Sequence, residues 1–245
     1  MMILALAISA PGPRGGSVTM RNLTLKIYVT LVACTALVGS ALMAIDYPVE
    51  EIRGWWVALI ATFALGTQSV AFPRHRVQLT VSDSFMFYAL VVHGPFAAVT
   101  VAFVGILGAT LLGSRQLTAQ QTIFNLGAVP LSAVLACAAF VSVSSTSAVL
   151  GLMVGSAVFF VGNTALVALV LTLEGRAPLK RAMRLSAPGF FLSILLTASA
   201  GSSLAYVAVA GPGEWMVAGV VGVCLLIGVV LSARRADEEG QAQLG

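Results

Sequence analysis

Four polar side chains lie inside or at the end of long apolar runs, where a polar group is costly and is therefore a candidate for function. They are one carboxylate and three amides: Asp83, Asn125, Asn163 and Gln68. A carboxylate in apolar surroundings binds a cation, a proton or a ligand amine, and amides hold a small solute by hydrogen bonds. We take the four residues as the candidate ligand-binding site. The structural alternative is a set of interhelical hydrogen bonds, with Asp83 capping a helix beside Arg74 or Arg76.

No residue pattern predicts catalysis or metal binding. The sequence contains no phosphate-binding glycine loop, no HExxH, no Ser/His/Asp set and no Cys/His spacing of a metal site. Each of the three cysteines, Cys34, Cys137 and Cys224, lies in an apolar run, where a thiol behaves as a small hydrophobe. We therefore expect no enzyme activity, no catalytic residues, no metal and no cofactor.

The composition predicts the surroundings in which these groups act. Of 245 residues, 59% are apolar and only 9% are charged, whereas a soluble domain has about 25% charged residues. A bilayer core about 30 Å thick needs about 20 apolar residues per helix. The predicted spans are Tyr28–Ile45, Trp55–Phe72, Val77–His93, Pro95–Leu112, Thr122–Val143, Ala148–Thr172, Gly189–Ala210 and Trp215–Ser232. The fold class is all-α, a polytopic transmembrane helical bundle of about eight spans.

The basic residues predict the orientation of the bundle. With eight spans, 12 of the 13 Lys and Arg residues fall on one face and only Arg53 falls on the other. The alternative has seven crossings, with Val77–Leu112 forming one helix and a re-entrant piece, and it scatters the bases over both faces. Because bases accumulate in cytoplasmic loops, we expect eight spans and both termini in the cytoplasm. The expected location is the inner (plasma) membrane of a bacterium.

The chain divides into three parts. Residues 1–25 are expected to be a disordered N-terminal tail, with Met20 as the natural start; residues 26–232 form the membrane domain, and residues 233–245 form a polar tail. Glycine spacing, such as Gly151-x-x-x-Gly155, predicts close helix contact and is compatible with a homodimer.

The loop Glu174–Pro188 is the candidate surface for a partner or for lipid. Its bases are Arg176, Lys180, Arg181 and Arg184. Leu179 and Met183 lie among them, a pattern that predicts a short amphipathic turn on the membrane. Attraction to anionic lipid explains this loop, and docking of a cytoplasmic protein is the alternative. Nucleic-acid binding is not expected, because membrane topology already accounts for the bases.

Several segments together resemble the membrane-associated sensor (MASE-type) region found upstream of bacterial HD-type phosphohydrolase, diguanylate cyclase or kinase domains. They are Leu25-Lys26-Ile27-Tyr28, the run Val77–Leu112 with its central Gly94-Pro95, Phe124-Asn125 and Asn163-Thr164. The resemblance covers about Leu25 to Ser232 and implies a sensor whose signal is unidentified. Family members continue into a catalytic domain, whereas this chain ends soon after Ala233–Glu239, so a sensor of this type would need a separate signalling enzyme or kinase.

The serine-rich entry to the third span, the Gly-Pro turn and the glycine-spaced helix are also similar to substrate-binding components of energy-coupling-factor transporters. Those components usually have six spans. Two functions are therefore open: a sensor or regulatory module that acts through a cytoplasmic partner, and a small-solute transporter subunit. A third reading is purely structural, with polar groups that only hold the helices together.

Overall fold

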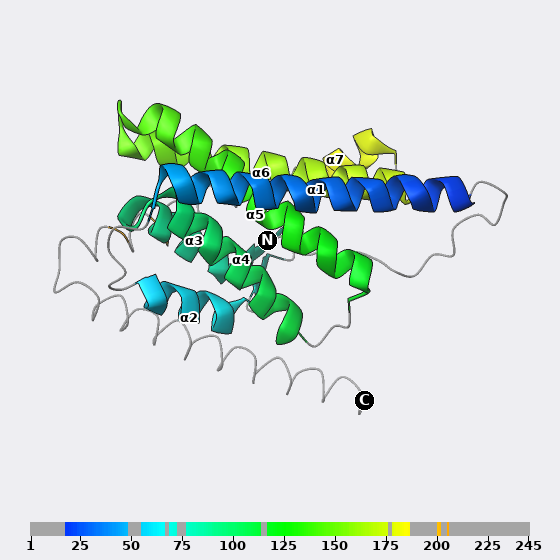
Figure 1. The fold of residues 1–245 in the computed structure, drawn as a ribbon, viewed down its shortest axis with the longest axis horizontal. Helices are drawn as coiled ribbons and strands as arrows, with labels where there is room; N and C mark the ends of the chain where they lie inside the picture. The colour runs from blue at the N-terminus through cyan, green and yellow to red at the C-terminus, as the bar shows by residue number, and fades with distance from the viewer. Residues whose placement is uncertain are drawn as a thin grey trace.

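The computed structural model describes residues 18–48, 55–66, 69–72, 77–113, 117–175, 178–186, 200–201 and 205. Within these residues the chain forms seven helices and one two-stranded hairpin (Figure 1). The helices α1, α5 and α6 contact one another, as do α2, α3 and α4, and α4 packs against α5 to join the two groups. The predicted helical fold class is confirmed at this level.

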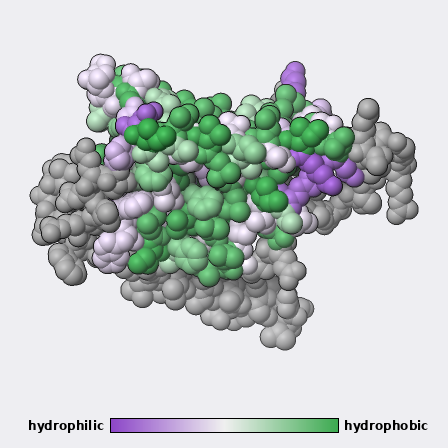
Figure 2. All heavy atoms as spheres, in the orientation of Figure 1, coloured by the Kyte–Doolittle hydropathy of each residue, from purple (hydrophilic) through white to green (hydrophobic). Residues whose placement is uncertain are grey.

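Three helices are long and apolar enough to cross a membrane: α1 (Val18–Asp46), α5 (Ala119–Ser144) and α6 (Ala148–Leu173). At 1.5 Å per residue, the 26 residues of α5 extend about 39 Å. Large apolar side chains of α1 are exposed along its length, and Figure 2 shows hydrophobic atoms over much of the visible face. Such a surface suits lipid rather than water. The chain is a multi-pass integral membrane protein.

The second and third predicted spans are not continuous helices. α2 covers only Trp55–Leu65 and α3 only Val81–Val92. Between them the strands β1 (Ser69–Phe72) and β2 (Val77–Thr80) pair antiparallel, Ser69 opposite Thr80 and Phe72 opposite Val77. The prediction of helix over all of Trp55–Phe72 and Val77–His93 was wrong, because apolar content alone does not separate a helix from a strand.

The α3–α4 turn has the predicted Gly-Pro chemistry. Gly94 has a φ of 89°, which a residue with a Cβ rarely adopts, and Pro95 opens α4 (Pro95–Leu111) at its first position. α5 starts with a capping box, in which the Thr118 hydroxyl accepts from the Gln121 N–H and the Gln121 side chain accepts from the Thr118 N–H. Pro130 lies inside α5, and the helix continues through it.

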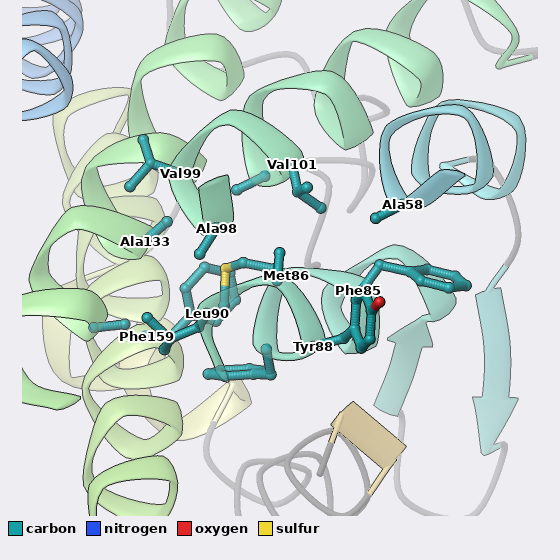
Figure 3. Close-up of a cluster of buried hydrophobic side chains, with 14 of the residues drawn as sticks. Ala58, Phe85, Met86, Tyr88, Leu90, Ala98, Val99, Val101, Ala133 and Phe159 are labelled. Atoms are coloured by element: carbon teal, nitrogen blue, oxygen red, sulfur yellow. The ribbon is translucent and has the colours of Figure 1, made fainter. Parts of the chain in front are cut away.

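The main core lies where five helices meet. Figure 3 shows side chains from α2 to α6 packed together around Met86, Leu90 and Phe159. A second cluster joins α1, α5 and α6, where Tyr28 stacks on Phe124 and its hydroxyl donates to the Leu166 carbonyl at 3.1 Å. These contacts fix how far each helix is shifted along its neighbours.

The two ends of the chain are described only in part. α1 begins at Val18, inside residues 1–25, which the sequence analysis assigns to an N-terminal tail. α7 (Leu179–Ser186) follows α6 and lies within Glu174–Pro188, the loop in which a short amphipathic turn was predicted. Of the predicted span Gly189–Ala210, only residues 200, 201 and 205 are described, and they are helical; Gly201 lies against Phe87 and Ser84 of α3. The predicted span Trp215–Ser232 and the tail 233–245 lie outside the described residues.

Candidate functional site

Eight polar side chains are buried among the described residues, and three of them are satisfied locally. Gln121 belongs to the capping box of α5. The hydroxyls of Ser132 and Ser156 donate to backbone carbonyls of their own helices, those of Ala128 and Leu152. The other five, none of them more than 5% exposed, make up a set that we name the polar layer. They are Thr62, Ser82, Asp83, Asn125 and Asn163.

Thr62 and Ser82 meet at a glycine of α4. A Cβ built on Gly105 would lie 2.8 Å from the Thr62 methyl carbon and 3.3 Å from the Ser82 Cβ. The backbone of α4 can approach α2 and α3 this closely only because Gly105 has no side chain. Both hydroxyl-bearing side chains therefore lie at the depth of Gly105.

Asp83 and Asn163 are placed at a common depth by an aromatic pair. The rings of Phe87 on α3 and Phe159 on α6 make an edge-to-face contact with centroids 6.0 Å apart. Asp83 comes four residues before Phe87, and Asn163 comes four residues after Phe159. The chain passes from α3 through α4 and α5 to α6 and reverses its direction at each of the three connections. α3 and α6 therefore run in opposite directions. Both polar residues therefore lie about one turn from the aromatic pair, on the same side of it.

Asn125 reaches the same depth from α5. The Cys137 thiol contacts the Pro95 carbonyl oxygen at 3.6 Å, which sets the antiparallel register of α4 and α5. Ten residues along α4 from Pro95 is Gly105, and ten residues back along α5 from Cys137 is Gly127, in the same turn as Asn125. Asn125 is two residues from Gly127, and two residues correspond to about 3 Å along the helix axis.

The contact between α5 and α6 gives a second comparison of the depths of Asn125 and Asn163. A Cβ on Gly155 would lie 3.1 Å from the Ala136 carbonyl oxygen. Eight residues on from Gly155 is Asn163, and eight residues back from Ala136 is Ala128. Asn163 and Asn125 are therefore separated by about 5 Å along the axis. Four helices thus contribute polar side chains to one layer of the bundle interior.

Two atoms of the layer have no hydrogen-bond partner within the described part of the chain, the Thr62 hydroxyl oxygen and the Asn125 amide nitrogen. Leaving a buried polar group unpaired costs about 1–3 kcal/mol, so such groups point to water or a ligand. Asp83 lies in the first turn of α3, where the partial positive charge of the helix N-terminus favours a carboxylate. Carboxylates, amides and hydroxyls are the kinds of group that orient a small polar solute in a protein site.

Three of the five residues were predicted from the sequence as candidate site residues: Asp83, Asn125 and Asn163. It missed Ser82, although the Ser82-Asp83-Ser84 triplet was a signal, and it missed Thr62, a single hydroxyl in an apolar run. Gln68 lies outside the described residues. Within the described residues, no three His, Cys, Asp or Glu side chains form a group that could hold a metal ion.

Two of the four basic candidates are fully described, and both lie on α7, which contacts α6. Lys180 and Arg181 are exposed on α7; Arg184 lies on α7 with only its backbone described, and Arg176 is outside the described residues.

Comparisons of this chain with protein-family models, with curated proteins and with solved structures found no match.

Proposed function

We propose that this chain is a membrane-embedded sensor or regulatory module that acts through a cytoplasmic partner, such as a diguanylate cyclase, an HD-type phosphohydrolase or a kinase. The polar layer carries the proposal. Five buried polar side chains share one depth, and two of their polar atoms lack partners among the described residues. A bundle that only had to hold together would pair such groups internally. An unmet donor in this interior suits a small polar signal molecule.

The connection between α6 and α7 supports a route for output. Asn163 lies on α6, and α6 contacts α7, the basic helix that follows it. Gly175, with a φ of 61°, ends α6 and lets the chain turn toward α7. A rearrangement at the polar layer would move the end of α6, and with it the surface that faces the cytoplasm in the proposed orientation.

One observation favours a second function, a small-solute carrier subunit. α2 and α3 are short helices connected through the hairpin β1–β2, and Thr62 and Ser82 lie near the ends of these helices that adjoin the hairpin. Interrupted helices whose ends meet near a buried polar site are typical of secondary transporters. The same layer would then bind a cargo instead of a signal.

Purification and reconstitution of the full chain from its native membrane distinguish the two functions. A sensor is expected to co-purify with a signalling enzyme, and the activity of that enzyme in nanodiscs should differ between wild type and Asn125→Leu. The matched control is Ser132→Ala, which removes a buried hydroxyl that is bonded within its own helix. Accumulation of a solute in vesicles that contain the chain alone would overturn the sensor proposal.

A further inference from the structure

α7 leaves an apolar face uncovered at the end of the bundle. Its residues Leu179 and Met183, four positions apart and therefore on one side of the helix, are 44% and 37% exposed. On α6, which contacts α7, Leu169 is 38% exposed. α7 therefore adjoins a helix, α6, that also exposes a large apolar side chain.

Basic side chains accompany this apolar face. Lys180 and Arg181 are exposed and follow Leu179 directly in the helix. Between Leu179 and Ser186 the sequence contains three basic residues and no acidic residue. A helix with an apolar side and a basic side lies in the plane of the membrane surface, with the apolar side in the acyl region and the bases among the headgroups.

The place of α7 in the fold fits that position. It lies near the end of the bundle at which α1 begins (Figure 1). The Gly175 turn ends α6 there, and the Arg181 N–H donates to the Pro178 carbonyl at 2.9 Å in the first turn of α7. α7 therefore starts where a membrane-spanning helix leaves the bilayer.

We propose that α7 is a binding surface for anionic lipid headgroups, with Leu179 and Met183 inserted at the interface and Lys180 and Arg181 contacting lipid phosphates. Charge complementarity and contact with α6, a helix long and apolar enough to cross a membrane, favour lipid over a protein partner. A base near an anionic membrane surface contributes about 1 kcal/mol, equivalent to about fivefold in the docking equilibrium. This proposal is inferred from α6 and α7 alone and does not rest on the sensor function proposed above.

Thiol accessibility tests this proposal on the full chain. The natural cysteines Cys34, Cys137 and Cys224 are replaced, and Met183→Cys is labelled with a water-soluble thiol reagent in nanodiscs of phosphatidylcholine, with or without phosphatidylglycerol. Labelling should slow severalfold when phosphatidylglycerol is present, and high salt should reverse the effect. A cysteine at Thr146, in the exposed turn at the other end of α6, should label equally in both lipids.

Charge variants make the test specific. Adding Lys180→Gln and Arg181→Gln should speed labelling in phosphatidylglycerol up to about 25-fold, whereas Arg181→Lys keeps the charge and should leave the rate unchanged. Lys26→Gln, which removes an exposed base from α1, is the control for a general charge effect. Equal labelling in both lipids would overturn the proposal. So would slow labelling that does not depend on salt or on these bases, because another protein surface or apolar burial alone would then hold α7.

Discussion

At the scale of single residues, the closest helix contact depends on glycine. A Cβ on Gly108 of α4 would overlap the Phe63 carbonyl oxygen of α2, and a Cβ on Gly66 would lie 2.5 Å from the Gly105 carbonyl oxygen. Backbone atoms cannot give way as a flexible side chain can. The glycines therefore determine how closely α2 approaches α4, and through Gly105 they set the position of Thr62 and Ser82.

Gly108→Ala is expected to destabilise the protein by about 1–3 kcal/mol, because the added methyl must push the two helices apart. Gly162→Ala is the matched control, since its Cβ would lie 3.7 Å from the nearest atoms, in ordinary van der Waals contact. Thermal unfolding in detergent, followed by the loss of monodisperse protein, measures both. A Tm for Gly108→Ala equal to that of Gly162→Ala would show that the crossing is looser than described.

Asn125→Leu is expected to leave stability unchanged or to raise it by about 1 kcal/mol. Leucine has a similar size and removes an amide nitrogen that is buried without a partner among the described residues. A residue kept for function at a cost in stability behaves in this way, whereas an interhelical hydrogen bond would be lost on substitution. The thermal midpoint of the purified protein is the readout, and a clear fall in the midpoint for Asn125→Leu would assign Asn125 a purely structural role.

At the scale of elements, the N-terminus of α5 depends on its capping box. Thr118 and Gln121 satisfy one another's backbone N–H groups at the point where the helix begins. Thr118→Ala should cost about 1 kcal/mol, and Thr118→Ser should restore most of it. Hydrogen exchange should be faster in the first turn of α5 for the alanine variant only. Unchanged exchange there would mean that packing against α1 and α4 holds the turn without its cap.

At the scale of the whole molecule, orientation follows from the distribution of charge. In the predicted arrangement the turn between α5 and α6, residues 145–147, faces outward, and the loop before α5 faces the cytoplasm. In intact cells, Thr146→Cys should react with a membrane-impermeant reagent, and Leu117→Cys should react only after lysis. A fluorescent reporter at the C-terminus should be active and a phosphatase reporter inactive. Labelling of Leu117→Cys before lysis, or of Thr146→Cys only after lysis, would contradict the predicted orientation.

The sequence by itself determined that this chain belongs in a membrane, where its long helices lie, and that Asp83, Asn125 and Asn163 are polar groups in apolar surroundings. Those features follow from composition and local chemistry, because a polar group in an apolar segment loses its water and must find a partner there. Only the tertiary structure decided that α2 and α3 are short, since strand pairing between residues 69–72 and 77–80 outweighs an apolar pattern that suits either element. Only the packing of helices placed Thr62 and Ser82 beside Gly105 and brought the polar side chains of four helices to one depth, because register between helices is set by contacts such as Phe87 with Phe159 that no local pattern specifies.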